Sequence, residues 1–297
     1  MTAPIALFVY NRPTHTRQTV EALSTNALAA DSDLFIFSDA PKSASAAGGV
    51  GEVRSYLRQI EGFKSVTILE RETNWGVDPS VIDGVTMLCD RFGQVVVLED
   101  DLVTSPWFLT YVNHALDRYR DDDRVMQVSG FMFPLEGFDE REACFIPYST
   151  CWGWATWKRA WDKFDVDAEG YSQLKGDPRK QRAFNLDGAY DYFHQVERYV
   201  EGKTDAWDIR WYLSVFLQNG LSLFPTKSLV NNIGFDGSGV HCVASDLIIN
   251  ELAKTQITGF PTVVLNVRVW KAAKKYLNSR KERSFKSVVK SILRYGR

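Results

Sequence analysis

The chain has 297 residues, of which 45% are hydrophobic, and a net charge of −2; this suits one large α/β domain with additions, or two smaller domains. CxxC pairs are absent, since the cysteines are Cys89, Cys144, Cys151 and Cys242, so neither a zinc site nor a disulfide framework is indicated. No run approaches the ~18 apolar residues of a membrane-spanning helix, and residues 1–4 do not resemble a signal peptide. We therefore expect a cytoplasmic protein.

Charge is unevenly distributed along the chain. Residues 268–297 contain eleven Lys or Arg and one acid, Glu282, a net charge of +10, so the remaining residues must carry −12 to give the total of −2. The acidic body argues against general nucleic-acid binding, and the basic tail needs an explanation of its own.

The first hundred residues alternate between short apolar runs and amphipathic stretches. We predict strands at 5–10, 34–37, 66–69 and 95–98, and helices at about 14–28, 53–60 and 79–91. Such alternation is typical of βαβ units and a mostly parallel sheet. Between the second strand and its helix, the Ala/Ser/Gly stretch at 44–49 predicts a small flexible loop.

The fourth predicted strand ends in Glu99, Asp100 and Asp101. In an open α/β sheet, ligands bind beyond the carboxyl ends of the strands. A close pair of these charges repels by about 4 kcal/mol at an effective dielectric near 20, and a divalent cation with oxygen ligands would offset that cost. One acid could instead cap the next helix, but Ser105 and Pro106 already supply an N-cap and a first-turn proline. The acids therefore predict a metal or ligand site.

The other predicted strands also end in polar residues, and all four ends should share one sheet edge. These residues are Asn11 and Arg12 after the first strand, Ser38 and Asp39 after the second, and Asn74 and Gly76 after the third. Together they predict a binding cleft. Neither GxGxxG after the first strand nor GxxxxGK[ST] occurs, which argues against a dinucleotide cofactor or a P-loop. A nucleoside diphosphate held through a metal remains open.

Aromatic residues are concentrated between 151 and 161. Trp154, Trp157 and Trp161 have the spacing i, i+3, i+7, which predicts one face of a helix and favours core packing over a ligand platform. Trp152 precedes this stretch beside Gly153. Stacking on a sugar ring and internal packing both remain open for Trp152.

A later helix is predicted to run to about residue 219, with Thr204 or Asp205 as its N-cap and Asp208 one turn in. Asp208 has two interpretations. It either complements the helix dipole or acts as a general base whose ionisation is biased by the nearby Arg210. The polar segment 234–241 either closes over a ligand and presents His241, or is an ordinary surface loop.

The basic tail has a helical pattern. Its apolar stripe consists of Phe285, Val288, Val289, Ile292 and Leu293, with Lys286, Lys290 and Arg294 on another face. A basic amphipathic helix is typical of binding to an anionic membrane surface. Packing of the stripe on the protein body, or a dimer contact, is the alternative.

In their order and spacing, these segments resemble the metal-dependent glycosyltransferases of GT-A fold. The likeness spans about residues 3–241 and is greatest to bacterial family-2-like sugar transferases and to the inverting Golgi N-acetylglucosaminyltransferase family. The segments that carry it are Tyr10-Asn11-Arg12-Pro13, Phe37-Ser38-Asp39, Asn74-Trp75-Gly76, Leu98-Glu99-Asp100-Asp101, Trp152-Gly153-Trp154, Trp207-Asp208 and Gly239-Val240-His241.

The resemblance implies an α/β GT-A domain with a nucleotide-sugar-binding half at 1–130, a helical, aromatic-rich acceptor half at 131–260, and a basic helical tail at 261–297. It implies transfer of a hexosyl or N-acetylhexosaminyl group from a nucleotide-sugar donor, with uracil as the base, to a glycan or lipid-linked glycan. Mn²⁺ or Mg²⁺ would be the cofactor, and the inner membrane face a possible location.

Residue roles follow from the same resemblance. Asp101 would ligate the metal, and the donor would be bound by Asn11, Arg12, Asp39, Asn74, Glu99 and Asp100, with Arg12 and Asp39 at the nucleobase. Asp208 would be the catalytic base, with Asp205 as the alternative in a shifted register, and a single base predicts inversion. Trp152 and Gly153 would lie near the sugar and acceptor, and His241 near the diphosphate.

Two other functions remain open. A non-catalytic carbohydrate-binding protein would suit the nine tryptophans but not the acids at a strand end. A sugar nucleotidyltransferase would share the metal, nucleotide and sugar, but would carry a glycine-rich basic segment where this chain has Asn11-Arg12-Pro13.

Overall fold

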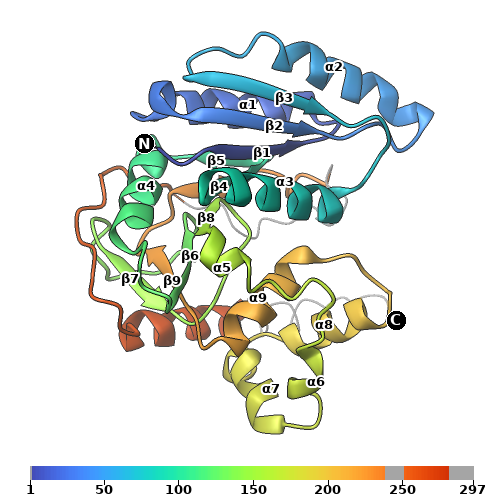
Figure 1. Cartoon of the computed structure of the whole chain (residues 1–297). Coiled ribbons are helices and arrows are strands. Elements are labelled where there is room, and N and C mark those ends of the chain that lie inside the picture. Colours follow the sequence, from blue (N-terminus) through green and yellow to red (C-terminus); the bar gives the residue numbers. More distant parts are fainter. Residues whose placement is uncertain (1, 238–250, 281–297) are drawn as a thin grey trace, which may run out of the picture.

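The structure is a computed structural model that describes residues 2–237 and 251–280 (Figure 1). Its amino-terminal part confirms the predicted alternation, with the four strands within one residue of their expected ends. The elements are β1 (Ile5–Val9), α1 (Pro13–Ser24), η1 (Ala29–Asp31), β2 (Asp33–Ser38), η2 (Ala44–Ala46), α2 (Ala47–Leu57), β3 (Ser65–Glu70), α3 (Val77–Phe92) and β4 (Gln94–Glu99).

The rest of the described chain alternates less regularly and contains several short helices. Its elements are β5 (Leu102–Thr104), α4 (Phe108–Arg118), β6 (Val125–Ser129), β7 (Ala143–Ile146), β8 (Trp154–Trp157), α5 (Lys158–Trp161), α6 (Tyr171–Leu174), α7 (Pro178–Phe184), η3 (Leu186–Gly188), α8 (Tyr192–Val200), α9 (Trp207–Leu217), β9 (Leu221–Pro225) and β10 (Val230–Asn232). A further helix covers residues 267–280.

One large sheet organises the molecule, with strand order β3-β2-β1-β4-β8-β6-β9-β7. Strands β3, β2, β1 and β4 are mutually parallel; β8 is antiparallel to β4 and β6, and β7 is antiparallel to β9. The fold is therefore mixed α/β with a mostly parallel sheet flanked by helices. Because β1 to β4 are parallel neighbours, their carboxyl ends share one edge, as predicted.

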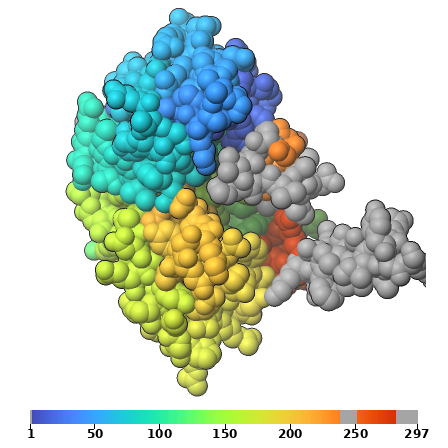
Figure 2. Space-filling model, turned by 90° about the vertical axis from the view of Figure 1, so that its right-hand side faces the viewer, coloured from blue at the N-terminus to red at the C-terminus, as the bar shows by residue number. Residues whose placement is uncertain are grey.

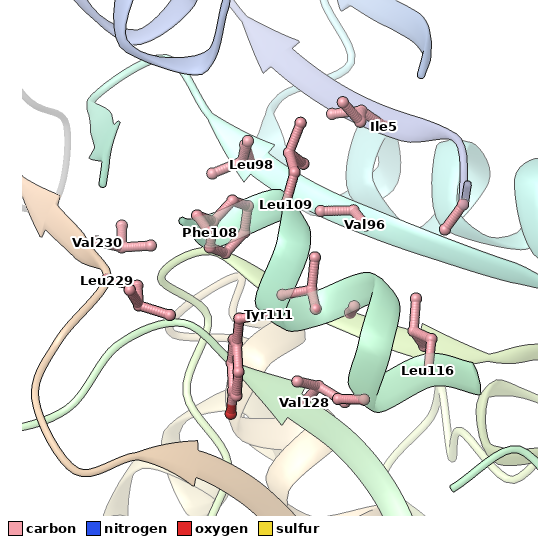
Figure 3. Close-up of a cluster of buried hydrophobic side chains, with 14 of the residues drawn as sticks. Ile5, Val96, Leu98, Phe108, Leu109, Tyr111, Leu116, Val128, Leu229 and Val230 are labelled. Carbon is pink, nitrogen blue, oxygen red and sulfur yellow. The ribbon is translucent and has the colours of Figure 1, made fainter. Parts of the chain in front are cut away.

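Both faces of the sheet are covered by helices, which explains the uninterrupted apolar runs in its central strands. Alternate residues of β1 enter different cores: Ile5 and Leu7 face α1, α2 and α4, whereas Phe8 faces α3 and α9. Figure 3 shows the first of these cores, where Phe108 and Leu109 of α4 lie beside the side chains of β4. The two packed faces fix the edge at which the polar strand ends meet.

A third core lies among α6 to α9, strand β7 and the helix at 267–280. It is rich in aromatic side chains, among them Tyr148, Phe184 and Tyr212. Figure 2 shows this helical half, in yellow and green, against the blue amino-terminal half. Helix α9 belongs to both the second and the third core, so it ties the helical half to the sheet.

The prediction of one helix through Trp154, Trp157 and Trp161 is wrong. Residues 154–157 form strand β8, which pairs antiparallel with β4, and only the four residues of α5 are helical. The strand sends Trp154 into the core beneath α9, with its ring 5.3 Å from that of Trp207, while Trp157 enters the opposite core. Core packing of these tryptophans is confirmed, but pairing with β4 overrides the helical spacing.

The flexible loop predicted at 44–49 is also wrong. This stretch forms η2 and the first turn of α2. Its glycine at position 49 lies against the turn after β1, where a Cβ atom would be 2.6 Å from the carbonyl oxygen of Asn11. Position 49 therefore needs glycine because α2 packs closely against the turn after β1, and not because the backbone there must be flexible.

The predicted cap of the helix after the acids is displaced. Strand β5 intervenes, and α4 begins at Phe108, two residues beyond Pro106, with Trp107 as N-cap and no side-chain cap. Ser105 instead donates its hydroxyl to the carbonyl of Ala253 at 2.9 Å. The chain directly after the acids thus forms strand β5 and not a helix. None of the three acids caps a helix.

The described part of the basic tail packs on the protein body. Asn266 caps the helix at 267–280, accepting a hydrogen bond from the amide of Val269 at 3.0 Å, and Val269 and Ala273 are buried in the third core. The predicted stripe from Phe285 to Leu293 lies outside the described residues, so membrane-surface binding stays a prediction. No helix within 2–237 or 251–280 is long and apolar enough to cross a membrane.

Two glycines of α2 provide a matched test of this packing. We expect Gly49→Ala to destabilise the protein by about 1–3 kcal/mol, because its Cβ would meet the Asn11 carbonyl. Gly51→Ala, where nothing lies within 4 Å of the added Cβ, should stabilise it by about 0.5–1 kcal/mol through helix propensity. Denaturant unfolding measures both values, and equal effects would contradict the packing described.

Candidate active site

The acids that follow β4 are held by one cation, Arg12. Its Nη2 donates a hydrogen bond to Oδ1 of Asp100 and, at 2.9 Å, to Oδ2 of Asp101. The backbone supports this arrangement, because the amide of Tyr10 points at Oδ2 of Asp100 at 3.4 Å and Thr19 Oγ1 donates to the Asp100 carbonyl at 2.8 Å. The predicted meeting of the first and fourth strand ends is thus a direct contact.

Burial and mutual repulsion make this edge electrostatically strained. Burial, followed by the charges of Asp101, Asp100 and Asp208, raises the pKa of Glu99 to about 8, while Arg12 lowers it. Burial also raises the pKa of Asp100, against the opposing effect of Arg12. Among these charges, that of Asp208 comes from the first turn of α9 (Trp207–Leu217).

The segment after β10 covers Asp101. The amide of Ile233 donates to the Asp101 carbonyl at 2.9 Å. At Gly234, a Cβ atom would lie 2.1 Å from Oδ2 of Asp101, so only glycine allows the main chain to approach the carboxylate. Phe235 then packs edge-on against Trp152, with ring centroids 5.5 Å apart.

Asp39 and Asn74 form a second polar cluster, where β2 and β3 end. Oδ1 of Asp39 accepts from the amides of Ala40 and Trp75, and Oδ2 accepts from Asn74 Nδ2 and the amide of Gly76, at 2.8–2.9 Å. Four hydrogen bonds fill the acceptor capacity of a carboxylate. Asp39 therefore holds the 74–76 turn in place, and it presents no spare acceptor to a nucleobase in this state.

Asp208 lies in the first turn of α9. The helix begins at Trp207 with Ala206 as its N-cap, so the predicted caps Thr204 and Asp205 are wrong. Asp208 keeps an exposed surface, yet burial by the surrounding protein raises the pKa of its carboxyl. The amide of Ile209 and the thiol of Cys151 act in the opposite direction by hydrogen bonding to it.

Arg210 does not pair with Asp208. Its Nη2 bonds Oδ2 of Asp78 at the start of α3, and its Nη1 donates to the Tyr199 hydroxyl at 3.1 Å. The Arg210 side chain is 2% exposed and that of Asp78 12%. This buried pair ties α9, which carries Asp208, to α3, which follows the turn held by Asp39.

Trp152 and Gly153 lie just before β8 and pack against the segment around β10. Trp152 is half-buried and contacts Phe131 as well as Phe235. Gly153 is buried with a φ of +62°, and a Cβ there would lie 2.6 Å from Val230. Gly153 is thus required by packing under β10, whereas the Trp152 ring packs edge-on against Phe131 and Phe235.

Three features of the site escape sequence reasoning. Gly234 beside Asp101, the Cys151 thiol on Asp208 and the Asp78–Arg210 pair all depend on contacts between distant segments. In the sequence, the position of Cys151 next to Trp152 is the one signal that could point to a place for its thiol in the site. Asp205 is exposed on the loop before α9, and His241 lies outside the described residues.

The residues present can hold a divalent cation only in part. Carboxylate oxygens suit Mn²⁺ and Mg²⁺, and Asp101 offers Oδ2, which Arg12 bonds and which the main chain at Gly234 approaches closely. No group of three His, Cys, Asp or Glu in the described parts of the chain forms a ready ligand set. To hold such a cation, Asp101 would need further oxygen ligands beyond its own carboxylate.

No protein-family model matches the chain, and no curated protein matches it significantly in sequence. Among solved structures, similar ones include S. aureus TarS, with 10% identity, a TM-score of 0.43, and coverage of 78% of this chain and 37% of that one. GalNAc-T7 with UDP, GalNAc and Mn²⁺ has 9% identity, a TM-score of 0.45, and coverage of 75% and 42%. This chain thus spans well under half the length of either.

A third similar structure is the mannosyltransferase PcManGT from Pyrobaculum calidifontis in complex with GDP-Man and Mn²⁺, with 10% identity, a TM-score of 0.40, and coverage of 72% of this chain and 69% of that one. All three likenesses are distant.

Breaking the Asp78–Arg210 pair should be costly. We expect Asp78→Ala to lower the free energy of unfolding by about 3–5 kcal/mol, because it leaves a buried guanidinium unpaired. Removing both charges in Asp78→Ala/Arg210→Met should cost less than Asp78→Ala alone. A denaturant double-mutant cycle measures this coupling, and additive effects would show that the pair contributes nothing.

Proposed function

We propose that the chain is a metal-dependent glycosyltransferase of GT-A type. It would transfer a hexosyl or N-acetylhexosaminyl group from a nucleotide-sugar donor, with UDP as the preferred nucleotide, to a hydroxyl of a glycan or lipid-linked glycan. The observation that carries this proposal is the acidic end of β4, where Arg12 bridges Asp100 and Asp101, together with Asp208 on α9, whose charge helps to raise the pKa of Glu99. Asp208 would be the general base of a site whose other side is formed by these acids.

The donor would lie along the edge formed by the carboxyl ends of β1 to β4. Asn11, Asn74, Glu99 and Asp100 would bind its nucleoside and sugar parts, with Asp39 acting through the 74–76 turn that it holds. Arg12 and Asp101 would lie at the diphosphate end, because they contact each other beside Gly234. This arrangement moves Arg12 from the nucleobase, where the family resemblance puts it, toward the phosphates.

Asp101 would hold the divalent cation together with the donor. When bound, that cation would neutralise the diphosphate leaving group. Trp152 would border the sugar, since its ring lies between Phe131 and the segment that covers Asp101. His241 stays a proposal for the diphosphate side, and residues 268–297 for contact with an inner-leaflet membrane surface.

Asp208 would act as the general base toward the acceptor. Burial raises the pKa of its carboxyl, which strengthens it as a proton acceptor, while the amide of Ile209 keeps the carboxylate oriented. The acceptor hydroxyl would lose its proton to Asp208 as its oxygen attacks the anomeric carbon from the face opposite the diphosphate. Such attack inverts the anomeric configuration.

Two aspartates on either side of the start of α9 test the assignment of the base. Asp208→Asn should lower the transfer rate by at least about a hundredfold, because the variant cannot accept the proton. Nucleotide affinity should stay unchanged. Asp205→Asn is the matched control and should keep wild-type activity, since Asp205 lies on the exposed loop before the helix. Rates come from nucleotide release with a sugar acceptor, and affinities from calorimetry.

An active Asp208→Asn enzyme would remove Asp208 from the mechanism, and an inactive Asp205→Asn enzyme would favour the shifted register. The two alternative functions give different results in the same assay. A sugar nucleotidyltransferase would consume a nucleoside triphosphate with a sugar 1-phosphate. A carbohydrate-binding protein would release no nucleotide from any donor.

A further inference from the structure

We propose that Arg12 is a built-in counter-ion that competes with the divalent cation for Asp101, so that metal binds well only when a diphosphate takes the guanidinium away. The inference rests on the proposed function in one respect, namely that Asp101 is the metal ligand. It adds a residue that controls the order in which metal and donor bind.

The first support is the geometry of the guanidinium. Nη2 of Arg12 spans both acids and reaches Oδ2 of Asp101 at 2.9 Å. The three side chains are largely enclosed, with 17% exposure for Arg12, 5% for Asp100 and 9% for Asp101. Because Oδ2 of Asp101 already carries the Arg12 guanidinium and lies against the main chain at Gly234, a cation that binds this oxygen would compete with the guanidinium.

The second support is the crowding on the same atoms. A Cβ at position 234 would lie 2.1 Å from Oδ2 of Asp101 and 3.0 Å from Nη1 of Arg12. The main chain therefore closes over the ion pair from one side, while the amide of Ile233 fixes the Asp101 backbone. Space for a second cation opens only if the Arg12 side chain moves.

The backbone of Arg12 is held by contacts separate from those of its guanidinium. Arg12 is the N-cap of α1 and precedes Pro13, which restricts its backbone. Its carbonyl accepts hydrogen bonds from the amide and the hydroxyl of Thr16, both at 2.9 Å. If the Arg12 guanidinium exchanged Asp101 for a diphosphate, its side chain would thus rotate while helix α1 stayed intact.

Charge explains why the exchange needs a diphosphate. A divalent cation beside a bound guanidinium would be repelled by it, and burial weakens screening. A diphosphate offers the guanidinium new oxygen acceptors in a bidentate geometry that suits arginine. Metal and diphosphate should therefore each raise the affinity for the other.

Binding of Mn²⁺ to the protein without nucleotide tests the idea, with free Mn²⁺ followed by its electron paramagnetic resonance signal. Arg12→Met and Arg12→Gln should bind Mn²⁺ about tenfold or more tightly than wild type, because a charged hydrogen bond to Asp101 no longer competes. Arg12→Lys, which keeps the charge, should stay near wild type. The matched control is Arg17→Met, since Arg17 lies on the same helix with its guanidinium 4.4 Å from the Tyr56 ring centre.

A second measurement, the melting temperature with and without Mn²⁺, tests the proposal even if the Arg12 variants are less stable than wild type. Mn²⁺ should raise the melting temperature of Arg12→Met and Arg12→Gln more than that of wild type. Adding Asp101→Ala to Arg12→Met should remove the gained affinity. Unchanged or weaker Mn²⁺ binding in both neutral variants would overturn the proposal, as would a gain that persists without Asp101.

Failure of the role of Arg12 can be told apart from failure of the proposed function. If wild type binds Mn²⁺ with a nucleoside diphosphate but the Arg12 variants gain nothing, only the role of Arg12 is wrong. If wild type binds no Mn²⁺ even with UDP, GDP, CDP or dTDP, and the variants bind none either, both the metal-dependent function and the role of Arg12 are wrong.

Discussion

The compensation of negative charge at the end of β4 is the constraint on which this site depends. Glu99, Asp100 and Asp101 follow one another, and Asp208 adds a fourth carboxylate from α9. A close pair of like charges costs about 4 kcal/mol at an effective dielectric near 20. Arg12 bridges two of the acids, and the raised pKa of Glu99 reflects first its burial and then the repulsion that remains.

The fold brings these charges together by two separate routes. Parallel pairing of β1 with β4 sets the end of one strand beside the end of the other, which makes the contact between Arg12 and the acids a local consequence of the sheet. Asp208 instead lies on α9, which packs against Trp154 and is joined to α3 by the Arg210–Asp78 pair. The donor side and the base side of the proposed site are therefore coupled through α3 and α9.

Sequence reasoning reached the strands, their common edge and the acids, because alternation and β-branched runs are local signals. It failed where distant contacts decide. Trp154 and Trp157 have a helical spacing, but pairing with β4 makes them a strand. Arg210 is two residues from Asp208, yet its long side chain reaches Asp78 in another element. The full hydrogen-bonding of Asp39 and the need for glycine at 234 likewise depend on neighbours that the local sequence does not reveal.

The most direct measurement is calorimetric binding of UDP, GDP, CDP and dTDP with and without Mn²⁺, with Asp101→Ala as the control variant. We expect one nucleotide to bind tightly only when Mn²⁺ is present, and Asp101→Ala to lose the metal-dependent part of the affinity. Equal binding with and without Mn²⁺, or no binding of any nucleotide, would contradict a metal-dependent nucleotide-sugar site at the end of β4.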